Sequence, residues 1–185
     1  ADLVPRMRRV ISGLAAKPVT VDVMDPLTSA SIKVELSAFD LQWLTAQALA
    51  DPRTLATLPE AYRAMANGEF GMIARIAVMA RRRAGIGNAM KPLMDVASGA
   101  TTQRSQRIND EAMTALLGSA LNFPDRQLAD AWGAEDLGDA FRAPIVSDVP
   151  ALVFVGDVDM RTPVDNGIAL QAGMPSAHLV VLKNV

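Results

Sequence analysis

Two continuous apolar stretches near the carboxyl end of the chain predict buried strands. The first, Ala151–Val155, is β-branched at its third and fifth positions and is followed at once by Gly156. The second is Ala177–Leu182. Strands that are covered on both faces have such uninterrupted patterns, whereas half-exposed strands alternate. We therefore expect the two stretches to pair as parallel strands.

The residues between these stretches predict a helix. Thr162 is a suitable N-cap residue, Pro163 fits the first helical position, and Asn166–Gln171 continue the helix. Gly173 and Pro175 end it. A strand, a helix and a second strand in this order form a βαβ unit with a right-handed crossover.

Strict alternation of apolar and polar residues predicts a β-hairpin closer to the amino end. Val19–Val23 and Ile32–Leu36 both alternate, which is typical of strands with one solvated face. The turn between them begins at Asp25-Pro26. Before the hairpin, Leu3–Ala16 has the amphipathic spacing of a helix, which Lys17-Pro18 ends.

Most of the remaining chain is predicted to be helical. Ser37 and Asp40 have the spacing of a capping box, which opens a helix that continues to about Ala50. Further helices are expected before Asn67-Gly68, at Phe70–Ala84, at Thr101–Leu117 and at Asp125–Trp132. The fold class is therefore α/β, with a mostly helical region over residues 1–142 and a βαβ unit over residues 149–185.

Composition narrows the function classes only slightly. The 185 residues are 50% hydrophobic, which excludes a disordered chain, and no apolar run approaches the length of a membrane span. A net charge of -2 gives no electrostatic basis for binding nucleic acid. Because the chain has no cysteine and only one histidine, we expect no disulfide, no thiolate catalysis, no metal site and no cofactor. The compartment, cytoplasmic or secreted, stays open.

Charged residues at two places have simple local interpretations. Arg81, Arg82 and Arg83 end a predicted helix, where cations complement the helix dipole and face solvent. Asp157 and Asp159 follow the first apolar strand, at its carboxyl end, where open α/β sheets bind their ligands. Either aspartate can also be a solvated or capping carboxylate of the loop.

The order strand, Gly-x-x-Asp-x-x-Thr-Pro, helix and strand, from Gly156 to Leu182, resembles the last third of an α/β-hydrolase. More narrowly, it is similar to the proline iminopeptidase and tripeptidyl aminopeptidase group of serine hydrolases. The resemblance implies that Asp159 is the acidic member of a Ser-Asp-His triad, with Asp157 a loop residue. In that role the carboxylate orients the histidine and stabilises its imidazolium form.

Two members of that triad are not in these residues. No Gly-x-Ser-x-Gly nucleophile elbow occurs, and the family's Gly-His pair is expected where Lys183–Val185 lie. His178 belongs to the second strand itself and cannot take the place of the base. The resemblance therefore implies a fragment that is inactive alone.

The helical region corresponds, in that resemblance, to the lid that covers the active site. Met90–Gly99 resembles the stretch that anchors the free amine of a peptide substrate, although Val96 and Ser98 depart from the family's residues there. Asp95 is the carboxylate that could bind an amine. A Pro-interrupted linker is the alternative interpretation of this stretch.

Three functions stay open at this point. The first is a peptidase that releases amino-terminal residues, and the second is an esterase or amide hydrolase with the same triad. The third is a non-catalytic helical binding or oligomerisation module. In the hydrolase interpretations the substrate is a peptide or a small ester or amide, without a cofactor, nucleic acid or membrane span. We also expect the chain to self-associate through Ala151–Val155, whose edge and faces lack covering elements.

Overall fold

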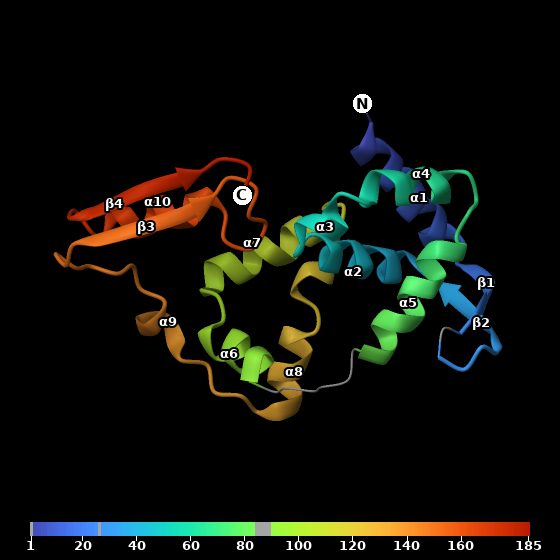
Figure 1. Cartoon of the computed structure of the whole chain (residues 1–185). Helices are drawn as coiled ribbons and strands as arrows, with labels where there is room; N and C mark the ends of the chain where they lie inside the picture. Colours follow the sequence, from blue (N-terminus) through green and yellow to red (C-terminus); the bar gives the residue numbers. More distant parts are fainter. Residues whose placement is uncertain (1, 26, 84–89) are drawn as a thin grey trace. The chain divides into compact units, whose positions relative to one another are not determined.

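The computed structural model describes residues 2–25, 27–83 and 90–185 (Figure 1). It forms two compact units, Ala1–Asp136 and Leu137–Val185. Helices make up about 52% of the chain, and each unit also contains a two-stranded sheet, antiparallel in the first and parallel in the second. The expected mixed α/β class is therefore confirmed.

The elements of the first unit follow the predicted order closely. They are α1 (Leu3–Ala16), β1 (Val19–Met24), β2 (Ser31–Leu36), α2 (Ala38–Ala48), α3 (Pro52–Leu55), α4 (Leu58–Ala66), α5 (Gly71–Arg83), α6 (Met90–Ser98), α7 (Thr102–Ala112), the 3-10 turn η1 (Ala120–Asn122) and α8 (Asp125–Trp132). The second unit contains α9 (Gly138–Phe141), β3 (Ala151–Gly156), α10 (Val164–Ala172) and β4 (Ala177–Leu182).

The core of the first unit forms around α1. Its buried residues repeat at intervals of three and four, the period that places side chains on one face of a helix: Met7, Val10, Ile11 and Leu14. This face packs against α2 and α4. The hairpin adds Val23, Val34 and Leu36 to the same cluster, and α5 adds Ala74 and Ala77. The alternation in the sequence therefore identified the buried face of each strand.

One polar pair is buried among these apolar groups. The Thr45 hydroxyl donates to the carbonyl of Leu41 at 2.7 Å, so the hydroxyl of Tyr62 must donate the 2.7 Å bond between Tyr62 and Thr45. Burial raises the pKa of Tyr62. Both hydroxyls thus have partners, which removes the cost of burying them without hydrogen bonds.

The hairpin pairs as predicted, with Val21 opposite Val34 and Val23 opposite Ile32. Pro26, predicted to lie in its turn, is outside the described residues. The Asp25 carboxylate holds the turn by accepting the backbone N–H of Leu27 at 2.9 Å. The same side chain is only 3% exposed.

The arginines at the end of α5 are exposed, as expected, but two of the three also form ion pairs that the sequence did not predict. Arg82 forms a bidentate ion pair with Asp25, and one of the two bonds is 2.7 Å long. Arg81 bonds to Asp40 at 2.8 Å and to the carbonyl of Glu35 at 2.8 Å. The sequence alone could not indicate this, because α5 meets the hairpin only in the folded unit.

The helices of the first unit follow the predicted local chemistry with two main differences. The capping box of Ser37 and Asp40 is present. The helix predicted at Thr101–Leu117 is capped by Thr101 but ends at Ala112. Met90–Ser98 is a helix and not a linker. Pro92 is compatible with this helix because it lies in the first turn, where a backbone N–H has no helical partner.

The second unit is the predicted parallel βαβ arrangement. Ala151 pairs with Ala177 and Val155 with Val181, and α10 packs on both strands. Gly167 is buried at that contact. A side chain at this position would collide with Val155 and Leu179. The predicted cap was wrong by one residue. Pro163 occupies the N-cap position and the helix begins at Val164, while Thr162 bonds to Asp159.

The pair of Asp25 and Arg82 predicts an acid-dependent stability of the first unit. The Arg82 guanidinium, together with the N–H of Leu27, holds the pKa of Asp25 well below its usual value of 3.8. A carboxyl whose pKa is lower in the folded state stabilises that state above pH 3.8, and this contribution is lost as the pH falls further.

We expect the free energy of unfolding to decline less steeply below pH 4 in Asp25→Asn than in the native sequence. Urea unfolding followed by tryptophan fluorescence measures this, because both Trp43 and Trp132 lie in the first unit. Asp22→Asn is the matched control from the same hairpin, since Asp22 on β1 forms an exposed ion pair with Lys33 on β2. Identical acid slopes for the native sequence and Asp25→Asn would contradict the prediction.

Candidate functional site

The carboxyl ends of β3 and β4 meet at one edge of the parallel sheet (Figure 1). The loop after β3 and the segment after β4 are bonded to each other there. The N–H of Asp157 donates to the carbonyl of Leu182 at 3.0 Å, and the N–H of Val158 donates to the carbonyl of Val185 at 3.1 Å. These bonds hold the start of the loop after β3 against the segment after β4.

Gly156 makes this close approach possible. A side chain at this position would collide with the carbonyl of Val185, so any larger residue must displace the segment after β4. A glycine follows the apolar run directly because this close approach leaves no space for a side chain.

The Asp159 carboxylate is fixed by its own loop. One oxygen accepts the N–H groups of Arg161 at 2.8 Å and Thr162 at 3.0 Å, and the other accepts the Thr162 hydroxyl at 2.6 Å. These bonds, the Thr162 hydroxyl first among them, lower the pKa of Asp159 below its usual value. The side chain is therefore ionised at neutral pH and fixed in orientation.

Asp157 has a different set of partners in the same loop. Its carboxylate accepts the N–H of Asn184 at 2.7 Å and lies 3.4 Å from the amine of Lys183. Both partners belong to the segment after β4. Asp157 therefore connects the two strand ends, whereas Asp159 is bound within one loop.

His178 does not lie at this edge of the sheet. It lies near the amino end of β4, opposite Leu152, and is exposed. Four residues separate it from the carboxyl end of the strand, roughly 13 Å at the rise of a β-strand. The only histidine of the chain therefore cannot bond to Asp159.

Asp95, the predicted amine ligand, belongs to the first unit. It lies on the exposed side of α6, and its backbone carbonyl accepts the Ser98 hydroxyl at 3.2 Å. Val96 and Ser98 are partly buried in the same helix. Asp95 belongs to the first unit and Asp159 to the second.

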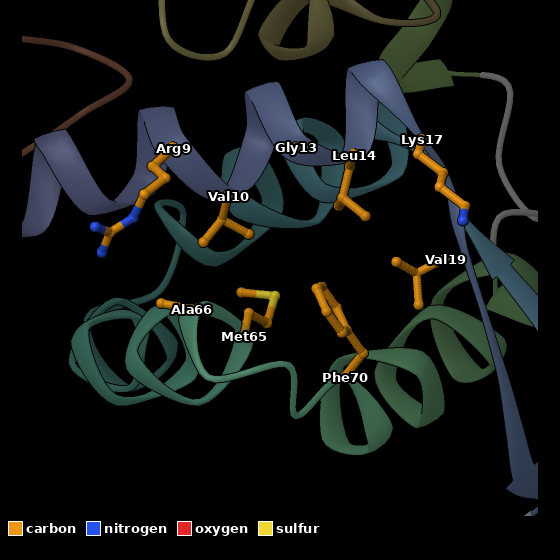
Figure 2. Close-up of a pocket in the computed structure, with 9 residues that line it drawn as sticks. All are labelled: Arg9, Val10, Gly13, Leu14, Lys17, Val19, Met65, Ala66 and Phe70. Carbon is orange, nitrogen blue, oxygen red and sulfur yellow. The ribbon is translucent and has the colours of Figure 1, made fainter.

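The first unit contains a pocket that the sequence did not predict (Figure 2). It has a volume of about 310 Å³ and lies between α1, α4 and the start of β1. The residues that line it are Arg9, Val10, Gly13, Leu14, Lys17, Val19, Met65, Ala66 and Phe70. Arg9, Gly13 and Lys17 follow one another at intervals of four, a spacing that could have indicated a second, polar edge of α1.

Neither a metal site nor a membrane helix is found in the part of the chain that the structure covers. Residues 2–25, 27–83 and 90–185 contain no cluster of three or more metal-binding side chains. No helix within these ranges has both the length and the apolar character needed to cross a bilayer.

The fold and the loop define a mixed α/β protein whose parallel βαβ unit presents an ordered carboxylate at the strand ends. No protein-family model, curated protein or solved structure matches the chain.

The bonds around Asp159 predict how its pKa depends on Thr162. Thr162→Val removes the hydroxyl donor and keeps the shape of the side chain, so the pKa of Asp159 should rise toward 3.8. Titration of the carboxyl carbon by NMR measures this value. Thr162→Ser, which keeps the hydroxyl, is the control and should leave the pKa low. An unchanged pKa in Thr162→Val would assign the effect to the backbone N–H groups alone.

Proposed function

We propose that this chain is the lid and the acid-bearing βαβ part of a serine hydrolase of the α/β-hydrolase fold, of the aminopeptidase type. The observation that carries the proposal is the ionised, oriented Asp159 at the carboxyl edge of two parallel strands. In open α/β sheets this edge is where ligands bind and where catalytic residues meet.

The bonds of Asp159 suit the acidic member of a triad. That residue must stay ionised, and it must hold a histidine in one orientation while a proton moves from the serine. The hydrogen bonds from Arg161 and Thr162 favour the ionised form. The oxygen that accepts the Thr162 hydroxyl has a second lone pair, which can accept the N–H of an imidazole.

The segment after β4 supports the same assignment. Residues 183–185 bond to the loop after β3, through the carbonyl of Val185 and through Asp157. In the proposed enzyme the histidine follows this segment and therefore emerges beside Asp159. The serine comes from a nucleophile elbow elsewhere in the enzyme. Since these residues contain neither group, we expect no hydrolysis from this chain alone.

The helical first unit is the lid in this proposal. Asp95 on α6 is its candidate for binding the free amine of a peptide, since a carboxylate is the natural partner of an ammonium group. An enzyme that acts on esters or amides without a free amine would not need it. The effect of Asp95→Asn on aminopeptide and simple ester substrates therefore distinguishes these two substrate classes.

The triad assignment predicts the activity of Asp159 variants in the complete enzyme. Asp159→Asn should lower kcat about 10⁴-fold, by analogy with the serine-protease triad, because the amide no longer stabilises the imidazolium. Steady-state turnover of an aminoacyl p-nitroanilide measures the loss. Asp157→Asn is the matched control from the same loop and should cost less than tenfold. Equal losses, or a loss under tenfold in Asp159→Asn, would remove Asp159 from the triad.

The proposal also predicts that the chain self-associates. Parallel sheets are normally covered on both faces and paired at both edges. In the described part of the second unit, β3 pairs only with β4, and Phe154 is 58% exposed on the face away from α10. Sedimentation velocity should therefore show a dimer or larger species at high concentration.

Phe154→Lys should shift this equilibrium toward the monomer, because it places a charge on the exposed face of the strand. Phe141→Lys is the matched control, since Phe141 is 60% exposed but lies in α9, outside the sheet. A monomer at all concentrations, or equal effects of the two variants, would contradict association through β3.

A further inference from the structure

The pocket of the first unit has an apolar floor and a charged edge. Its floor consists of Val10 and Leu14 of α1, Val19 at the start of β1, and Met65 and Phe70 on the opposite side. Figure 2 shows the side chains of Met65 and Phe70 pointing toward α1 across the cavity. At about 310 Å³, the pocket is at the small end of the range for small-molecule sites.

Two cations lie at the ends of this floor. Figure 2 shows Arg9 at one end of the row along α1 and Lys17 at the other, with Gly13 between them. The two positions are about 12 Å apart along the helix axis. None of the nine lining residues is acidic.

These two cations also differ from the paired arginines of the same unit. Arg63, Arg81 and Arg82 each form an ion pair. Neither Arg9 nor Lys17 has a carboxylate partner among residues 2–25, 27–83 and 90–185. Their positive charges are therefore available to an anionic ligand.

Gly13 is a second, independent feature of the pocket. Glycine in the interior of a helix is unfavourable, because it has the largest backbone entropy to lose. Packing does not require it here, since a side chain at this position would meet no atom within 4 Å. The missing side chain instead keeps the wall of the pocket open midway between Arg9 and Lys17.

We propose that this pocket binds a linear aliphatic carboxylate. The hydrocarbon chain lies over Val10, Leu14, Met65 and Phe70, and the carboxylate pairs with Arg9 or Lys17. An acid of about eight to ten carbons spans the separation of the two cations. A dicarboxylate of that length can pair with both of them at once. The site lies entirely in the first unit and does not depend on the hydrolase proposal.

Binding to the native chain tests the ligand class. Calorimetry and methyl NMR with decanoate should show saturable binding with shifts at Val10, Leu14 and Met65. From hexanoate to decanoate, each added methylene should tighten binding by at most about fourfold. Decanedioate should bind more tightly than decanoate, and the difference should shrink at high salt. Decanol should bind at least tenfold more weakly than decanoate.

Several results in this series would overturn the proposal. Equal affinities for decanol and decanoate would show that the cations do not take part. Shifts confined to other methyl groups would place the ligand elsewhere. An absence of saturable binding at millimolar concentrations would leave the pocket without this function.

Variants of α1 test the residues separately. Arg9→Gln and Lys17→Gln should each weaken decanedioate binding about tenfold, and the double variant should weaken it further. Arg8→Gln is the matched control, because it removes the same charge from the same helix outside the pocket. If Arg8→Gln is as damaging as Arg9→Gln, general attraction to the basic helix explains the binding and the proposed site is wrong.

Gly13 offers a variant that closes the pocket without removing a charge. Gly13→Leu should abolish binding by filling the space between the cations, and Gly13→Ala should reduce it less. Both variants should fold, because alanine and leucine favour a helix more than glycine does. Tryptophan fluorescence checks this. Undiminished binding in folded Gly13→Leu would overturn the proposal. If that variant fails to fold, the comparison of Arg9→Gln with Arg8→Gln decides.

Discussion

The first unit depends on burying one apolar stripe of α1. Met7, Val10, Ile11 and Leu14 have the spacing of a single helical face, and α2 and α4 cover this face. Truncating one of the larger side chains to alanine in such a core typically costs about 2–5 kcal/mol, a large fraction of the stability of a small domain. Once this stripe is buried, the orientation of α1 is fixed, and so is the direction in which its cations point.

The pocket is a consequence of that orientation. Val10 and Leu14 belong both to the buried stripe and to the pocket floor, while Arg9 and Gly13 lie along the neighbouring edge of the helix and Lys17 directly follows its last residue. The same rotation of α1 therefore determines the core and the candidate ligand site. Ion pairs then connect α5 to the turn of the hairpin, through Arg82 with Asp25, and to the start of α2, through Arg81 with Asp40.

A different constraint organises the second unit. Parallel pairing places the carboxyl ends of β3 and β4 at one edge, and the two segments that follow are then close enough to bond to each other. Small residues make this geometry possible. Gly156 allows the segment after β4 to approach the loop, and Gly167 allows α10 to lie against both strands. Hydrogen bonds within that loop fix the orientation of Asp159, the candidate catalytic residue.

The sequence by itself determined most of the local structure. Alternation predicted the hairpin, continuous apolar runs predicted β3 and β4, and the spacing of Ser37 and Asp40 predicted the capping box, because each signal acts over a few neighbouring residues. It also placed Asp159 in the loop after β3. Helix ends without such a signal were predicted less well, as at Ala112, and the helix α6 was not predicted at all.

Only the tertiary structure decided which distant groups meet. The bonds of Arg82 to Asp25, of Asp157 to Asn184, and the pocket between α1 and α4 all join residues that are far apart in the chain. No short-range pattern encodes these contacts, because they arise when packed elements bring their surfaces together. The sequence therefore determined the elements and the candidate residues, and packing decided their partners.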